Sequence, residues 1–196
     1  MEVNLPSPPV GGRSPRFIDN LKNLSNFTTI KLDHASTGTT FSGPNGEVLM
    51  VPQVGRTGLA LESLAHFDAS KAERLGVGLV ESPASDPIYR VLLPMKDLRT
   101  VTLYQSENLL IFIRVLHPST NSSGAVVFPR LEELIIMNSG KFGLKVVVAM
   151  AAARASRGAK PKTVRIAGWL QPTYPHLDVL ELKKHVLHVK CGCNVG

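Results

Sequence analysis

Short runs with the pattern apolar-x-apolar recur along the chain and alternate with longer amphipathic segments. An alternation with a period of two is typical of β-strands that bury one face. The runs are Ile30-Lys-Leu32, Leu75-Gly-Val77, Val101-Thr-Leu103, Leu134-Ile-Ile136, Val164-Arg-Ile166 and Leu187-His-Val189. Their first residues are 45, 26, 33, 30 and 23 positions apart, so the sequence predicts an irregular repeat of six strands.

Helical patterns occupy the segments between these runs. The clearest covers 142–157, where apolar residues recur at i, i+3, i+4 and i+7 from Leu144 to Ala155. Gly158 offers the left-handed position that ends many helices, and Pro161 prevents continuation. Weaker patterns cover 58–67, 87–93, 107–116 and 175–185. Because strands and helices alternate, we expect an α/β fold with parallel strands, right-handed crossovers and all helices on one face.

The segment 39–51 departs from this alternation. Pro44-Asn-Gly46 stands between two strand-like runs, which indicates a hairpin turn. We expect a small antiparallel insertion near the N-terminal end of the sheet, where it shields the first edge from other chains.

Length and composition indicate one domain with a hydrophobic core. The 196 residues are 43% hydrophobic and 19% charged, and no apolar stretch approaches the length of a membrane span. We expect a flexible Pro-rich leader at 1–25, a folded domain at 26–192 and a tail at 193–196. The first residues lack the pattern of a secretory signal, and there are two cysteines, Cys191 and Cys193. These features predict a cytoplasmic or nuclear protein without a membrane partner.

The net charge of +7 arises in the C-terminal part of the chain. Residues 1–140 hold 12 Lys and Arg against 13 Asp and Glu, whereas 141–196 hold 10 against two. The densest basic group is Arg154, Arg157, Lys160, Lys162 and Arg165. Binding of nucleic acid or an anionic surface through this group is the alternative function. One Trp and three Tyr provide few stacking platforms for bases, so a solvated helix face and turn is the favoured interpretation.

No motif in the sequence predicts catalysis, a cofactor or a metal. Gly76 and Gly78 begin a dinucleotide-type glycine motif, but the third glycine is missing and Pro83 interrupts the helix that should follow. Glycines that accommodate a close neighbour in a strand are the favoured interpretation. Four possible zinc ligands have a spacing that matches no structural zinc pattern: His185, His188, Cys191 and Cys193.

Two of the predicted strands, 98–103 and 131–136, have an LxxLxL-like pattern and resemble leucine-rich repeats of the long, helix-containing kind. Four phrases are similar to the C-terminal region of mushroom-type fungal F-box proteins: LLPMKDLRTVTL (92–103), FPRLEELII (128–136), MAAARASRGAKPKTVRI (150–166) and DVLELKKHVLHVKCG (178–192). This resemblance covers 26–192. It implies a short leucine-rich-repeat-like solenoid, with helices on its convex side, that binds a protein substrate for a ubiquitin ligase. We expect the chain to lack the F-box itself, and adaptor binding with it.

Strand alternation also assigns the two sides of the predicted sheet. We expect these residues to point into the core: Val101, Leu103, Leu134, Ile136, Val164 and Ile166. The residues between them, with Gly76, should form a ladder on the open, concave side, and Tyr104 and Met137 follow two positions further along. The candidate partner-binding residues are therefore Lys31, Thr102, Tyr104, Ile135, Met137, Arg165 and His188. The leading hypothesis is a non-enzymatic protein-recognition domain.

Overall fold

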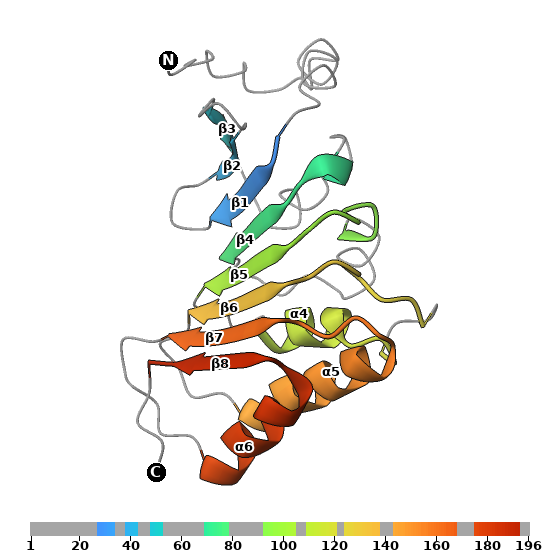
Figure 1. Cartoon of the computed structure of the whole chain (residues 1–196). Coiled ribbons are helices and arrows are strands. Elements are labelled where there is room, and N and C mark those ends of the chain that lie inside the picture. Colours follow the sequence, from blue (N-terminus) through green and yellow to red (C-terminus); the bar gives the residue numbers. More distant parts are fainter. Residues whose placement is uncertain are drawn as a thin grey trace.

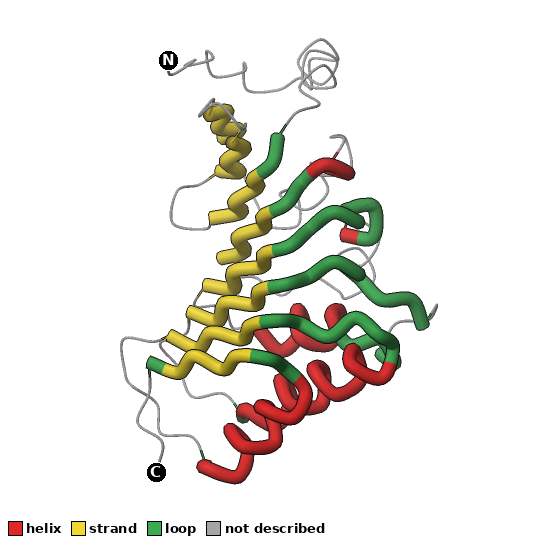
Figure 2. Tube along the Cα trace, viewed as in Figure 1, coloured by secondary structure: helices red, strands yellow, loops and turns green. Residues whose placement is uncertain are grey.

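The computed structural model describes residues 27–33, 38–42, 48–52, 69–78, 92–104, 109–120, 124–137, 143–167 and 175–192. These residues form an α/β fold with one eight-stranded sheet and helices on one of its faces (Figures 1 and 2). The predicted leader 1–25 and tail 193–196 lie outside the described residues, as do the predicted helix 58–67 and most of 87–93.

The sheet contains the six predicted strands, and each of these six is paired parallel with the next of the six. They are β1 (Thr29–Asp33), β4 (Arg74–Gly78), β5 (Thr100–Tyr104), β6 (Glu133–Met137), β7 (Thr163–Ala167) and β8 (His188–Cys191). Parallel neighbours need a connection that returns the chain to the same end of the sheet. The α/β prediction is therefore confirmed.

The predicted hairpin extends the sheet at its N-terminal side. β2 (Gly38–Ser42) pairs antiparallel with β1, and β3 (Val48–Pro52) pairs antiparallel with β2. The resulting strand order is β3-β2-β1-β4-β5-β6-β7-β8. This placement confirms the expected antiparallel insertion, while its turn, 43–47, lies outside the described residues.

The three described α-helices occupy the connections between consecutive strands from β5 to β8, on the same face of the sheet (Figure 1). They are α4 (Leu109–Leu116), α5 (Leu144–Ser156) and α6 (His176–His185), preceded by the short 3-10 turn η1 (Ala69–Lys71). Gly158 follows α5 with a φ of 73°, and its N–H donates to the carbonyl of Ala155. The predicted helices 107–116, 142–157 and 175–185 are confirmed within 109–116, 144–156 and 176–185, and the glycine stop is confirmed as well.

The hydrophobic core lies between the sheet and these helices. All six side chains predicted to point inward are at most 1% exposed: Val101, Leu103, Leu134, Ile136, Val164 and Ile166. They belong to one buried cluster with helix residues such as Phe112, Val147 and Leu182. The other alternate residues of each strand point to the opposite face, which has no helix cover in the described part of the molecule.

A repeated backbone motif precedes the parallel strands. The carbonyl of Glu73 accepts the N–H groups of Arg99 at 2.8 Å and Thr100 at 3.0 Å, and the carbonyl of Arg99 accepts those of Glu132 and Glu133. Equivalent pairs of bonds are accepted by the carbonyls of Thr28, Glu132 and Lys162. Each successive chain segment therefore enters the sheet with the same geometry.

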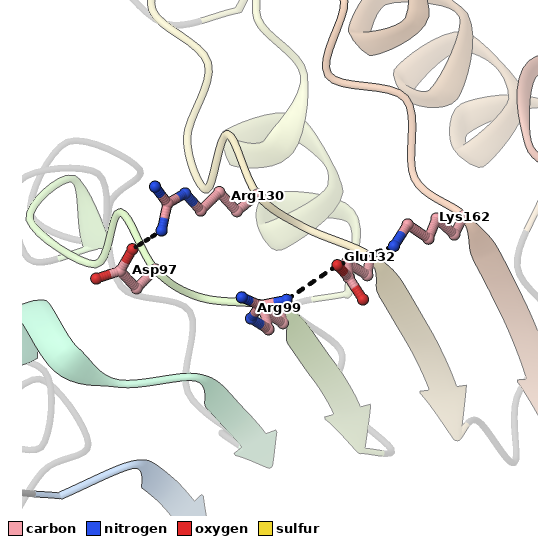
Figure 3. A network of polar contacts seen from close by, with 5 residues as sticks. All are labelled: Asp97, Arg99, Arg130, Glu132 and Lys162. Atoms are coloured by element: carbon pink, nitrogen blue, oxygen red, sulfur yellow. Dashed lines mark hydrogen bonds and ion pairs between the residues drawn. The ribbon is translucent and has the colours of Figure 1, made fainter.

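Charged side chains at these equivalent positions are also paired. Glu132 Oε1 lies 3.1 Å from Arg99 Nη1 and 3.0 Å from Lys162 Nζ, which connects the starts of β5, β6 and β7 (Figure 3). Arg130 and Asp97 form a neighbouring pair. The hydrogen bond from Lys162, with the positive charges of Lys162 and Arg99, holds the pKa of Glu132 below its ordinary value.

One member of the predicted basic group is buried in the core. Arg154 on α5 is 0% exposed, so its assignment to a solvated helix face is wrong. Its guanidinium donates to the carbonyls of Val127 and Phe128 at 2.7 Å and of Leu116 at 3.3 Å. Burial lowers its pKa to about 10, which leaves the group charged at neutral pH. These carbonyls replace part of the water that the cation loses, whereas Nε is buried without a hydrogen-bond partner among the described residues.

The register of β8 differs from the prediction by two residues. Val189 is paired with Val164 and Cys191 with Ile166, whereas Leu187 precedes the strand and is 63% exposed. Val186, which is 2% exposed, fills the core directly after α6 and turns Leu187 outward. The repeat spacing before β8 is therefore 25 residues rather than 23, counted from Val164 to Val189.

Candidate functional site on the open face of the sheet

The face of the sheet opposite the helices, called the open face below, presents one row of side chains across six strands. The strand register aligns Lys31, Gly76, Thr102, Ile135, Arg165 and Lys190. The first five residues were all predicted to belong to this ladder. The sixth place was predicted for His188, which faces the same side but lies opposite Thr163, while Lys190 lies opposite Arg165.

The carboxyl ends of β5 to β8 form an open groove of about 480 Å³ on this face. The side chains that give it its character are Thr102, Tyr104, Ile135, Met137, Arg165 and Lys190. Five of the seven predicted partner-binding residues therefore come together, whereas Lys31 and His188 do not line the groove. Sequence reasoning missed Lys190, although Val189-Lys-Cys191 is a second apolar-x-apolar run that would have indicated it.

Tyr104 bounds the groove on the side of β4 and β1. A Cβ atom on Gly76 would lie 3.2 Å from Cε2 of Tyr104 and 3.3 Å from Cγ of Lys31, so the glycine makes room for both side chains. Nζ of Lys31 lies 5.5 Å from the centre of the Tyr104 ring, a cation–π distance. These contacts agree with the interpretation of Gly76 as a residue that accommodates a close neighbour.

Arg165 and Lys190 give the groove a positive side. Both side chains are exposed, and the two residues are cross-strand partners in the parallel register. Like charges directly opposite each other in a sheet repel. None of the described residues that line the groove is a carboxylate, and neither cation forms an ion pair within the described part of the chain. The repulsion between Arg165 and Lys190 is therefore not neutralised by a carboxylate among the described residues.

The basic group of the sequence does not form one surface. Arg154 is in the core, Lys162 is paired with Glu132 at the strand starts, and Arg165 is on the open face. The predicted cation patch is therefore divided over three environments.

The cysteine and histidine cluster does not assemble a metal site in the described residues. Nε2 of His185 lies 3.4 Å from Glu181 on its own helix, and Cys193 is outside the described part. No group of three His, Cys, Asp or Glu side chains there is arranged to hold a metal ion. No helix within the same residues combines the length and apolar character needed to cross a membrane.

Comparison of the chain with protein-family models, with curated proteins and with solved structures found no match.

Proposed function

We propose that this chain is a non-enzymatic protein-recognition domain that binds a partner protein on its open face. The observation that carries the proposal is the groove, in which Tyr104, Ile135 and Met137 lie on the face of the sheet that none of the described helices covers. Met137 is 40% exposed. Aromatic and large apolar side chains grouped on a surface are characteristic of the centres of protein interfaces.

In this proposal the fold is a short leucine-rich-repeat-like solenoid, and the open face is its concave side. Three features support this interpretation. Neighbouring strands from β4 to β8 are consecutive in the sequence, the described helices share one face, and the same carbonyl motif begins each parallel strand after β1. In solenoids each repeat contacts mainly its neighbours, and the strand side provides an extended binding surface.

The resemblance to mushroom-type F-box proteins narrows the proposal to the substrate-binding region of a ubiquitin ligase subunit in the cytoplasm or nucleus. The four phrases that carry the resemblance include β5, β6, α5 with β7, and α6 with β8. Four of these elements, the strands β5 to β8, line the groove, whereas the helices in the phrases lie on the other face of the sheet. The proposal concerns substrate recognition and leaves adaptor binding aside.

The division of the basic group weakens the alternative of nucleic-acid binding. Binding of a phosphate backbone needs several cations along one surface. Here Arg154 is used by the core and Lys162 by an ion pair, so two of the five predicted cations are committed within the fold.

Site-specific photo-crosslinking tests the proposal. A p-benzoyl-phenylalanine at Met137, which is 40% exposed on the open face, is compared with one at Leu110, which is 44% exposed on α4. In an extract of the cells that make the protein, we expect defined crosslinked partners from position 137 only. The yield of these crosslinked partners from position 137 should fall when Ile135→Asp and Tyr104→Ala are added.

Circular dichroism and thermal melting establish that the added substitutions leave the domain folded. Identical crosslinks from positions 110 and 137, or crosslinks from 137 that survive both substitutions in a folded variant, would contradict recognition through the open face.

A further inference from the structure

The groove at the carboxyl ends of β5 to β8 combines an apolar surface with a positively charged one, and both are complementary to the same kind of ligand. Ile135 and Met137 on β6 supply an apolar floor, and Arg165 and Lys190 on β7 and β8 supply the positive side. We propose that this groove binds an acidic peptide segment that carries at least one large apolar side chain. The inference rests on the proposed function and specifies the partner chemistry.

The two cations of the groove are complementary to an acidic ligand. Arg165 and Lys190 lie directly opposite each other, and their flanking open-face neighbours on β7 are Thr163 and Ala167. Glu133 faces the same side on β6, but it does not line the groove and forms no ion pair with Arg165 among the described residues. A ligand carboxylate placed between the two cations removes their repulsion and gains charge-assisted hydrogen bonds.

The apolar floor selects a peptide over a nucleic acid. Ile135 and Met137 offer no hydrogen bond to a base or a sugar, whereas they can pack against a leucine or phenylalanine side chain. The aromatic wall, Tyr104, already has Lys31 over its ring at 5.5 Å, which occupies one of its two faces. A groove of about 480 Å³ lies in the range of sites that hold small ligands, so it accommodates a few residues of a longer segment.

An unbiased peptide selection tests the inference. A phage library of random dodecapeptides is selected on the immobilised full chain, and the enriched peptides are synthesised with a fluorescent label. Their dissociation constants are measured by fluorescence anisotropy for the wild type and for Arg165→Glu, Lys190→Glu and Ile135→Asp. Lys160→Glu is the matched charge control, because Lys160 is exposed in the turn between α5 and β7.

The expected peptides contain Asp or Glu together with a large apolar residue. Their affinity should fall at least about tenfold in Arg165→Glu, in Lys190→Glu and in Ile135→Asp, and by less than about twofold in Lys160→Glu. Each single charge reversal on the open face turns the like-charged pair into an opposite-charged one. The two variants should therefore unfold at the same or a higher urea concentration than the wild type, which separates lost binding from lost folding.

Several results would overturn the inference. These are enrichment of neutral or basic peptides, equal loss of affinity in Lys160→Glu, and no enrichment above an uncoated surface. A labelled 20-nucleotide single-stranded DNA or RNA that binds with the same dependence on Arg165 and Lys190 and displaces the peptides would assign the cations to phosphates instead. In each case the crosslinks from position 137 decide separately whether the open face still binds a protein.

Discussion

Arg154 links α5 to the chain that leads into β6. Its two shortest hydrogen bonds go to the carbonyls of Val127 and Phe128, and Phe128 has a φ of 51°, a left-handed conformation that is uncommon outside glycine. Such a conformation costs a non-glycine residue roughly 1–2 kcal/mol. The guanidinium and the burial of the Phe128 ring, 2% exposed, hold this turn in place.

Replacement of Arg154 by Met should therefore destabilise the domain strongly. The substitution keeps much of the buried volume but leaves the carbonyls of Val127 and Phe128 without these donors. We expect a loss of roughly 2–5 kcal/mol in the free energy of unfolding, measured by urea denaturation. Arg157→Met, three residues later and exposed, should change stability by less than about 0.5 kcal/mol. Equal effects of the two substitutions would show that the buried bonds contribute little.

The helical spacing of the sequence indicates that position 154 is buried, but the charge of arginine suggested that it is exposed. Leu144, Val147, Ala151 and Arg154 follow a helical spacing, and the structure buries all four. Reasoning from residue type placed the cation in solvent, because periodicity says nothing about backbone carbonyls contributed by a distant segment. The partners of Arg154 are 26 to 38 residues away in the chain, a separation that no local pattern encodes.

The alternation along β6 permits a direct test of the sheet's two sides. Leu134 is 0% exposed in the core, whereas Ile135 is half-buried on the open face. Leu134→Ala should cost roughly 2–5 kcal/mol, through lost burial and the cavity that remains. Ile135→Ala, one residue later, should cost clearly less, because solvent already reaches its side chain. Thermal melting compares the two variants, and a larger loss for Ile135→Ala would reverse the assignment of the faces.

At the level of whole strands, the sequence predicted five of the six parallel strands in register and failed at β8. Leu187-His-Val189 and Val189-Lys-Cys191 are both acceptable apolar-x-apolar runs, and the pattern alone does not choose between them. The end of α6 decides, since Val186 enters the core and the strand begins only at His188. A shift of two residues preserves the faces, so the error moved one site residue along the strand without turning it over.

The ion pairs at the strand starts should make stability depend on acid. Lys162 and Arg99 lower the pKa of Glu132 below its ordinary 4.5, so the ionised carboxylate favours the folded state above that pH. Protonation removes this contribution as the pH falls through the lowered pKa. Glu132→Gln should therefore lower the melting temperature at pH 7, and the difference from the wild type should shrink below about pH 4.

The matched control is Glu73→Gln. Glu73 occupies the equivalent place before β4, and its carboxylate forms no ion pair among the described residues. The difference in melting temperature between Glu73→Gln and the wild type should therefore stay nearly constant across the same pH range. A constant difference between wild type and Glu132→Gln from pH 7 to pH 3 would contradict the electrostatic explanation.

Across the whole molecule, protection of the backbone should follow the strand order. β6 and β7 have parallel neighbours on both sides and lie against the helices, whereas β8 has a neighbour on one side among the described strands. Backbone amides of edge strands open more easily than those of central strands. Hydrogen exchange followed by mass spectrometry should show slower exchange in 133–137 and 163–167 than in 188–191.

The hairpin strands β2 and β3 should also exchange faster than β6, since β3 ends the sheet on the other side. Equal protection of β8 and β7 would mean that the C-terminal edge is covered by contacts beyond those of the described residues.

The six parallel strands lie in the sheet in the order in which they occur in the chain, and this has a consequence for synthesis on the ribosome. From β1 to β8, every parallel strand leaves the ribosome when the strand it pairs with has already been made. No early strand has to wait for a late one from the far end of the chain, as happens in sheets whose central strands come last. The sheet can therefore grow outward from its N-terminal side as translation proceeds. Among the described strands, the growing edge moves from β4 towards β8, while β3 stays as the edge on the other side.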